Sequence, residues 1–254
     1  MKNKVSIIIP FYKNTILLKK TLSSVYKQDY TNYEIIIIND NNVRENITFL
    51  KKLNKNKIKI IYNKKNLGAG FSRNKGIRAA VGQYIAFLDS DDTWKKNKLS
   101  YQLRFMKKKR YLASHTSYNL VNVYGKKISK RKARNLNYKE LLNSCDIGLS
   151  TVILNKDILK FVNNFPKLKT KEDYVLWLKL SKNGIIFHSI DKYLTNWTKV
   201  PKSLSESLSQ KIKDAFLVYY KYLNFNILTS ILKTLILSIN YIKKKWSHII
   251  SKFV

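Results

Sequence analysis

The sequence Phe87-Leu88-Asp89-Ser90-Asp91-Asp92 places three carboxylates within four residues, directly after an apolar run. That run, Tyr84 to Leu88, is rich in aromatic and branched residues, which predicts a buried strand. Carboxylates at the end of a buried strand repel one another and lose solvation, so a positive charge is expected beside them. Two interpretations stay open. The acids hold a divalent cation, or Asp91 or Asp92 caps a helix that starts at Thr93.

The first ninety residues alternate between apolar runs and amphipathic segments, with short connections. The predicted strands are Val5–Ile9, Glu34–Ile38, Lys57–Tyr62 and Tyr84–Leu88, and the predicted helices are Asn14–Gln28, 43–53 and Ala69–Ala80. This alternation predicts an α/β fold, with a mostly parallel, Rossmann-like sheet flanked by helices on both faces. Ligands of such sheets bind beyond the carboxyl ends of the strands. Pro10 to Tyr12, Asp40 and Asp89 to Asp91 should therefore meet in one crevice.

The pattern is less regular after Trp94. The expected elements are a basic helix over Lys95–Arg110, one or two strands over Tyr111–Tyr124, a loop over Lys126–Arg134, a strand over Leu149–Leu154, a helix over Tyr174–Lys182 and a last strand over Ile185–Ile190. Asn137 and Glu140 have the spacing of a capping box, as do Ser203 and Glu206. From Ser203 onward, apolar residues recur at helical spacing.

Composition limits the class of protein. The 254 residues carry a formal net charge of +35, which favours polyanionic partners such as an anionic membrane, a phosphorylated substrate or nucleic acid. The one cysteine, Cys145, allows no internal disulfide and fits a reducing compartment. The N-terminal apolar run is too short for a signal peptide, and the chain has no uninterrupted apolar stretch of about 20 residues. We expect a cytoplasmic protein.

Several residues suit a nucleoside diphosphate. Asp89 and Asp91 would hold a cation between phosphates, Asp40 could accept a hydrogen bond from a base or sugar, and the Arg73 guanidinium could meet a phosphate. Neither the phosphate-binding loop of nucleotide hydrolases nor a Gly-x-Gly-x-x-Gly segment after the first strand is present. Kinase and dehydrogenase functions are therefore disfavoured. A nucleic-acid binder would explain the charge, but it would leave these ordered acids unexplained.

Five segments, taken in order, resemble the motifs of the family 2 glycosyltransferases of GT-A fold. They are Val5–Tyr12, Ile36–Asp40, Asn66–Ile77, Phe87–Trp94 with its Asp-x-Asp motif, and Lys171–Leu178 with its Glu-Asp pair. The resemblance covers residues 5 to about 205. It implies a GT-A domain over residues 1–205, followed by a basic amphipathic helical extension over residues 206–254.

The resemblance also implies roles. Asp173 would be the general base of an inverting transfer from a nucleotide-sugar donor, usually a UDP-sugar, to a glycan or lipid-linked acceptor in surface-polysaccharide synthesis. Asp89 and Asp91 would bind Mg²⁺ or Mn²⁺. The nucleotide-sugar would contact Asp40 through its base, Arg73 through its diphosphate and Asp89 through its ribose. Pro10, Tyr12 and Ser90 would complete this binding site.

The chain departs from the family pattern at two places. Asn39 replaces the first acid of the usual pair, so a non-catalytic sugar-nucleotide module stays open as an alternative. The segment from Asn196 to Ser205 has no histidine, where the family often has one before its final helix.

The apolar stripe from Leu228 to Ile249 allows two interpretations: a helix packed on the domain, or a helix lying at an anionic membrane surface with its lysines toward the headgroups. The second favours a peripheral position on the cytoplasmic face of the inner membrane.

Overall fold

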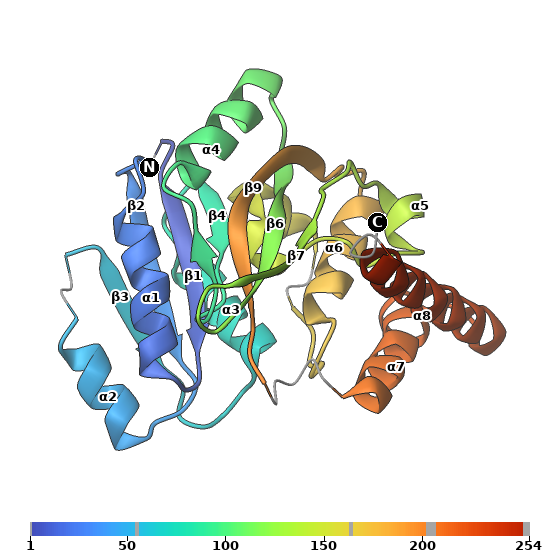
Figure 1. The fold of residues 1–254 in the computed structure, drawn as a ribbon, viewed down its shortest axis with the longest axis horizontal. Coiled ribbons are helices and arrows are strands. Elements are labelled where there is room, and N and C mark those ends of the chain that lie inside the picture. Colours follow the sequence, from blue (N-terminus) through green and yellow to red (C-terminus); the bar gives the residue numbers. More distant parts are fainter. Residues whose placement is uncertain (1, 54–55, 163–164, 202–206, 251–254) are drawn as a thin grey trace.

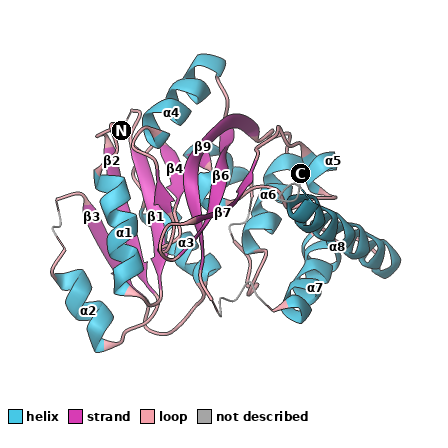
Figure 2. Cartoon of the chain, viewed as in Figure 1, coloured by secondary structure: helices cyan, strands magenta, loops and turns pink. Residues whose placement is uncertain are grey.

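The computed structural model describes residues 2–53, 56–162, 165–201 and 207–250 (Figures 1 and 2). The elements in chain order are β1 (Val5–Phe11), α1 (Thr15–Tyr26), β2 (Tyr33–Asn39), α2 (Arg44–Lys51), β3 (Ile58–Tyr62), α3 (Ala69–Ala79), β4 (Tyr84–Phe87), β5 (Thr93–Trp94), α4 (Lys98–Lys109), β6 (Ala113–Asn122), β7 (Lys127–Arg131), α5 (Tyr138–Leu141), the 3-10 turn η1 (Leu149–Thr151), β8 (Ile153–Asn155), the 3-10 segment η2 (Lys156–Phe161), α6 (Glu172–Lys182), β9 (His188–Lys199), α7 (Leu208–Leu217), the π-helical turn η4 (Val218–Tyr222) and α8 (Ile227–Ile250).

The first four strands form a parallel half-sheet, as the sequence predicts, and the structure shows that their order is β3-β2-β1-β4. Branched side chains alternate between its faces. Ile8 and Ile36 pack on the side of α3, whereas Ile7 and Ile35 pack on the side of α1. Each face therefore has its own hydrophobic core, and the prediction of helices on both faces of the sheet is confirmed.

Helix α3 approaches the sheet closely through one glycine. A Cβ on Gly76 would lie 2.5 Å from Cγ2 of Ile8 and 3.0 Å from Cδ1 of Ile38, so a larger residue would push the helix away. Gly68, just before the helix, has a φ of +83°, a backbone conformation that favours glycine. These two glycines place the N-terminal turn of α3, with Arg73, over the edge of the sheet where β1 ends.

The second half of the sheet is mixed and continues in the order β4-β8-β6-β9-β5. Strand β8 is antiparallel to both β4 and β6, β9 is parallel to β6, and β5 is antiparallel to β9. The fold class is the predicted α/β class. The strong curl of this half in Figure 1 carries the end of β9 back to the loop after β4.

Three sequence predictions for this half are wrong in detail. The expected loop over Lys126–Arg134 contains strand β7, which pairs with β6 despite its basic residues. The expected strand over Leu149–Leu154 begins as the turn η1, and only its end belongs to β8. Strand β9 extends to Lys199, well beyond the predicted end, because its polar residues bond across the sheet to β6 rather than forming an apolar run. The capping box at Asn137 and Glu140 is confirmed.

Helices α7 and α8 lie at the end of the molecule opposite α2 and β3 (Figure 1). Within the described residues, no helix is long and apolar enough to cross a membrane. The second predicted capping box, at Ser203 and Glu206, lies outside the described residues.

Candidate active site

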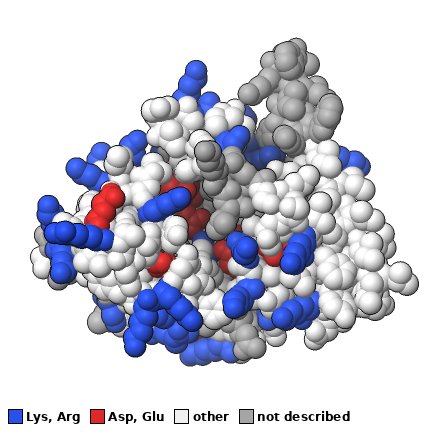
Figure 3. Space-filling view, turned by 90° about the horizontal axis from the view of Figure 1, so that it is seen from below, with Lys and Arg blue, Asp and Glu red and all other residues white. Residues whose placement is uncertain are grey.

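The acids of the opening stretch lie where β4 ends. The amide of Leu88 continues the strand by donating to the carbonyl of Ile8 (3.1 Å), and the amide of Asp89 donates to Oγ of Ser150 (3.0 Å). Figure 3, which views the molecule from the side toward which β1 runs, shows acidic atoms near the middle of this face with lysine and arginine side chains around them. The three acids have different surroundings, and their roles therefore differ.

Asp92 has a structural role. It is fully buried, and its carboxylate accepts hydrogen bonds from Oγ of Ser150 (2.6 Å) and from the amide of Thr198 (2.7 Å). Burial, together with the charges of Asp91 and Asp89, raises its pKa well above the usual range. The prediction that it caps a following helix is wrong, because the next element is the short strand β5. Asp92 instead fastens the end of β9 to the acidic loop.

Asp91 is the acid most available to a cation. Burial and then the charge of Asp89 raise its pKa to about 7. Among the described residues, no group outside its own backbone donates a hydrogen bond to the side chain of Asp91. Asp89 uses only Oδ1 in its contact with Arg73, which leaves its other carboxylate oxygen for a cation. Two carboxylates with unused oxygens fit a hard divalent cation that takes its other ligands from phosphates and water. Within the described residues, no group of three or more His, Cys, Asp or Glu side chains could hold a metal ion.

Arg73 joins the two acidic segments. Its Nη2 contacts Oδ1 of Asp89 (2.7 Å), its Nη1 contacts Oε1 of Glu172 (2.6 Å), and its guanidinium lies over the ring of Phe165. Burial by itself would lower its pKa, but the charges of Asp89 and Glu172 outweigh burial and raise it. Both terminal nitrogens of Arg73 are therefore engaged in ion pairs, and the predicted contact with a diphosphate would have to share them.

Asp173 is the second residue of α6, next to Glu172. Lys171 precedes the helix in a left-handed conformation (φ 63°), and Oδ1 of Asp173 accepts a hydrogen bond from the amide of Tyr174 (2.8 Å). Burial and the adjacent Glu172 charge raise the pKa of Asp173 to about 7, while Arg73 acts in the opposite direction. A carboxylate with a pKa near neutrality suits proton abstraction at cellular pH.

Asp40 ties a loop to the end of β2. Its Oδ1 accepts from Nδ2 of Asn63 (2.7 Å) and the amide of Leu67 (2.8 Å), and its Oδ2 accepts from the amide of Gly68 (2.8 Å). Three donors already surround this buried carboxylate, which fixes the turn that leads into α3. The structure thus gives Asp40 a positioning function that the sequence does not reveal, and its predicted contact with a base remains a prediction.

The other predicted contacts lie at the same edge. Pro10 is near the end of β1, paired with Ile38 in the sheet register, and Ser90 is partly buried between the acids. The side chain of Tyr12 is half exposed, and its carbonyl accepts from Nδ2 of Asn46 (2.8 Å). Asn46 also bonds to Oδ1 of Asn39, so the residue in place of the usual acid belongs to a buried amide network.

The chain was compared with known proteins. The sequence profile described as "Glycosyl transferase family 2" matches residues 6–159. The chain belongs to this family. The teichuronic acid biosynthesis glycosyltransferase TuaG of Bacillus subtilis (strain 168), a putative assignment by its name, is 32% identical over 86% of this chain and 88% of its own length. WfgD of Escherichia coli, named a UDP-Glc:alpha-D-GlcNAc-diphosphoundecaprenol beta-1,3-glucosyltransferase, is 35% identical over 72% of this chain and 71% of its own length.

Other relatives are longer, and three of them are spanned by the chain over only 27%, 40% and 32% of their length. Among solved structures, S. aureus TarS (residues 1–349) in complex with UDP-GlcNAc has a TM-score of 0.69 at 22% identity, over 89% of this chain and 69% of that one. The mannosyltransferase PcManGT of Pyrobaculum calidifontis, solved with GDP-Man and Mn²⁺, has a TM-score of 0.61 at 14% identity, over 89% and 68%. These likenesses show the GT-A fold.

The sequence missed the residues that connect the segments. Glu172 stands in a quoted motif, but nothing in the pattern indicates that it pairs with Arg73. Ser150 lies in a turn with no motif, and it contacts both Asp89 and Asp92. Ser150 and Thr151 are the two polar residues in the otherwise apolar run Leu149–Leu154, and this is the one signal that could have drawn attention to Ser150.

Proposed function

We propose that this family 2 glycosyltransferase moves a hexose or N-acetylhexosamine from a UDP-sugar to a hydroxyl of a lipid-linked glycan during bacterial surface-polysaccharide synthesis, with inversion at the anomeric carbon. The observation that best supports this proposal is that Arg73 connects the acidic segment of Asp89 and Asp91, which suits a cation, to the start of α6, where Asp173 has a pKa of about 7. The names of WfgD and TarS, which mention a UDP-sugar, support this donor class.

Asp173 would accept the proton of the acceptor hydroxyl as that oxygen attacks the anomeric carbon. The bond from this carbon to the diphosphate oxygen breaks in the same displacement, and the nucleoside diphosphate leaves with its electron pair. Asp89 and Asp91 would hold Mg²⁺ or Mn²⁺, and the chemistry that such a cation supplies is compensation of negative charge on the leaving group. Arg73 keeps Asp89 and Glu172 in place around this step.

The relative WfgD is named for an acceptor carried on diphosphoundecaprenol, a lipid. An acceptor of this kind supports a peripheral position of the present protein on the cytoplasmic face of the membrane. Nucleic acid is disfavoured as a partner of this site, because in the absence of a cation the acids at its centre would repel a phosphate backbone.

The direct test supplies the purified chain with Mn²⁺, a panel of UDP-, GDP- and dTDP-sugars and a synthetic GlcNAc-diphospholipid. We expect one UDP-sugar to be transferred, with mass spectrometry giving the added sugar and NMR giving an inverted linkage. A retained configuration would contradict a single displacement with Asp173 as base. Transfer from a GDP- or dTDP-sugar alone would contradict the donor assignment.

A further inference from the structure

Helix α8 distributes its residues in the opposite way to an ordinary surface helix. The side that packs on the domain buries Ser230, Thr234 and Leu237, and two of these three carry hydroxyls. The outer side exposes about half or more of each of six apolar residues: Leu228, Ile231, Leu232, Leu235, Ile239 and Ile242. A helix that serves only the fold of a water-soluble domain turns its apolar stripe inward. The outer stripe of α8 therefore indicates a partner that covers it.

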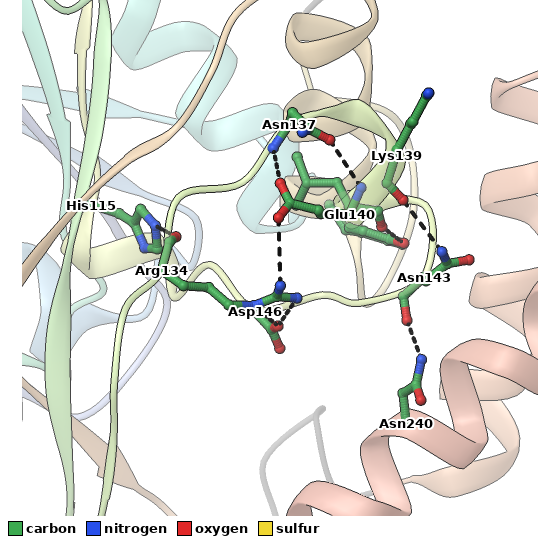
Figure 4. Close-up of polar contacts among 10 residues, drawn as sticks. His115, Arg134, Asn137, Lys139, Glu140, Asn143, Asp146 and Asn240 are labelled. Carbon is green, nitrogen blue, oxygen red and sulfur yellow. Dashed lines mark hydrogen bonds and ion pairs between the residues drawn. The ribbon is translucent and has the colours of Figure 1, made fainter.

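Hydrogen bonds fix this orientation. Oγ of Ser230 donates to the carbonyl of Asn226 (2.8 Å), and Oγ1 of Thr234 donates to the carbonyl of Ser230 (2.7 Å), so the inward hydroxyls are satisfied. Nζ of Lys233 and Nδ2 of Asn240 both donate to Asn143, at 3.0 Å and 2.9 Å, and Figure 4 shows the contact from Asn240. The helix cannot turn its apolar side inward without breaking the two bonds to Asn143.

The apolar surface continues from α8 onto α7. Ile212, Phe216 and Leu217 of α7 face Ile231 and Leu235 of α8 across a groove of about 450 Å³. Among the described residues, Lys213 is the only charged side chain that lines it. A groove of this chemistry suits a hydrocarbon chain, and it joins the outer stripe of α8 into one apolar surface, here called the α7–α8 surface.

The charge of this region decides between possible occupants. Residues 207–254 contain eight lysines and a single acid, Asp214. Asp214 is buried and accepts hydrogen bonds from the amide and Oγ1 of Thr170, both at 2.8 Å, whereas Lys213, Lys221 and Lys243 are exposed. Two copies of this chain meeting through the α7–α8 surface would bring two sets of like charges together. An anionic lipid surface would instead attract them.

We infer that the α7–α8 surface is the membrane-docking face of the protein, with its apolar side chains in the acyl boundary of an anionic bilayer and its lysines among the headgroups. Helix α8 is thus packed on the domain through one side and presents its apolar stripe to lipid on the other. This inference rests on the proposed function, because a lipid-linked acceptor requires the protein to meet a membrane. Because α8 is bonded to the domain, docking would hold the active site at a fixed orientation to the membrane.

The test measures flotation of the full chain with vesicles of equal parts phosphatidylcholine and phosphatidylglycerol. We expect binding that weakens in about 1 M NaCl, where the Debye length is about 3 Å and charges are screened. Binding to vesicles of phosphatidylcholine alone should be much weaker. The double variant Leu232→Gln and Leu235→Gln should lower the partition coefficient by about tenfold or more, since two apolar anchors are lost.

A matched control changes two apolar residues of similar exposure away from α8. Val81 is 48% exposed and Leu112 is 44% exposed, against 56% for Leu232 and 54% for Leu235. Val81→Gln with Leu112→Gln should leave the partition coefficient unchanged. All proteins are also checked for thermal stabilisation by a UDP-sugar with Mn²⁺, which reports an intact fold and donor site. Equal loss of vesicle binding in both double variants would overturn the assignment of this surface.

Sedimentation velocity tests the alternative occupant of the α7–α8 surface, a second copy of this chain. A wild-type dimer that dissociates in Leu232→Gln with Leu235→Gln, together with no vesicle binding by the wild type, would show a second copy on this surface and refute membrane docking. Transfer to a water-soluble acceptor distinguishes the two proposals. Vesicle binding without any transfer would contradict the proposed function alone, and transfer without vesicle binding would contradict the docking inference alone.

Discussion

The two acidic pairs of the site, Asp89 with Asp91 and Glu172 with Asp173, are built alike although they come from distant parts of the chain. In each pair one acid is ion-paired with Arg73, and the other forms no ion pair with a described residue. In each pair the acid without an ion pair has a pKa raised to about 7, chiefly by burial. One arginine therefore divides four acids into two that are held and two that are available.

The difference within each pair has a physical reason. A buried acid whose charge is compensated by a guanidinium keeps its position as long as the arginine remains. A buried acid without such a partner binds a proton or a cation more readily, because its isolated charge is poorly solvated. We therefore propose a positioning role for Asp89 and Glu172, cation binding for Asp91 with help from Asp89, and proton transfer for Asp173.

The largest effect is expected for Asp173→Asn. The amide cannot accept the proton of the acceptor, so the rate of sugar transfer should fall about 10³-fold, within the range for loss of a general base. Stabilisation by UDP-sugar and Mn²⁺, measured by thermal shift, should persist. The matched control is Glu140→Gln, which changes a partly exposed acid of a helix cap and should leave transfer nearly unchanged. Equal rates in Asp173→Asn and the wild type would remove Asp173 from the mechanism.

The next effect concerns the arginine that joins the pairs. Arg73→Met leaves Asp89 and Glu172 without their cation, so urea unfolding should show a loss of about 3 kcal/mol, in line with breaking a buried ion pair. Arg78→Met, on the exposed side of the same helix, provides the control and should change stability by less than about 0.5 kcal/mol. If both variants are equally stable, Arg73 does not hold the two acidic segments together.

The pH profile tests the available acid of the second pair. Asp173 must be charged to accept a proton, and burial raises its pKa to about 7. We expect kcat/KM to be constant above that pH and to fall about tenfold for each pH unit below it. Melting temperatures recorded over the same range check that the fold persists. A rate that stays constant down to pH 5 would mean that the base has an ordinary carboxylate pKa.

The smallest effect concerns the first pair and a cation. A folded-state pKa raised from 3.8 to about 7 means that Asp91 is protonated at pH 5 and charged at pH 8, where it repels Asp89. In the absence of metal, this acid lowers stability as the pH rises from about 4 to 7. Mn²⁺ should therefore raise the melting temperature more at pH 8 than at pH 5, by about 2–4 °C.

Asp91→Asn should remove most of this pH-dependent response to Mn²⁺. Asp157→Asn, which changes an exposed acid paired with Lys160, should retain it. Identical Mn²⁺ shifts at the two pH values in the wild-type protein would argue against cation binding by Asp91.

The sequence alone determined the parallel half of the sheet. Runs such as Val5–Ile9 and Tyr84–Leu88 are buried on both faces, so their apolar character is continuous and easily recognised. It also located the family and the acidic segments, because these features lie in short local stretches. Strands β7 and β9 were predicted poorly, since their polar residues depend on pairing with β6, and that pairing joins distant parts of the chain.

Only the tertiary structure decided what each acid does. Asp91 and Asp92 are neighbours in sequence, yet Asp92 receives hydrogen bonds from Ser150 and Thr198 while Asp91 remains available. Glu172 and Arg73 are 99 positions apart, and no local pattern connects them. The sequence fixes which side chains can ionise, but burial and partner charges set their pKa and their role, and both arise only when the chain has folded.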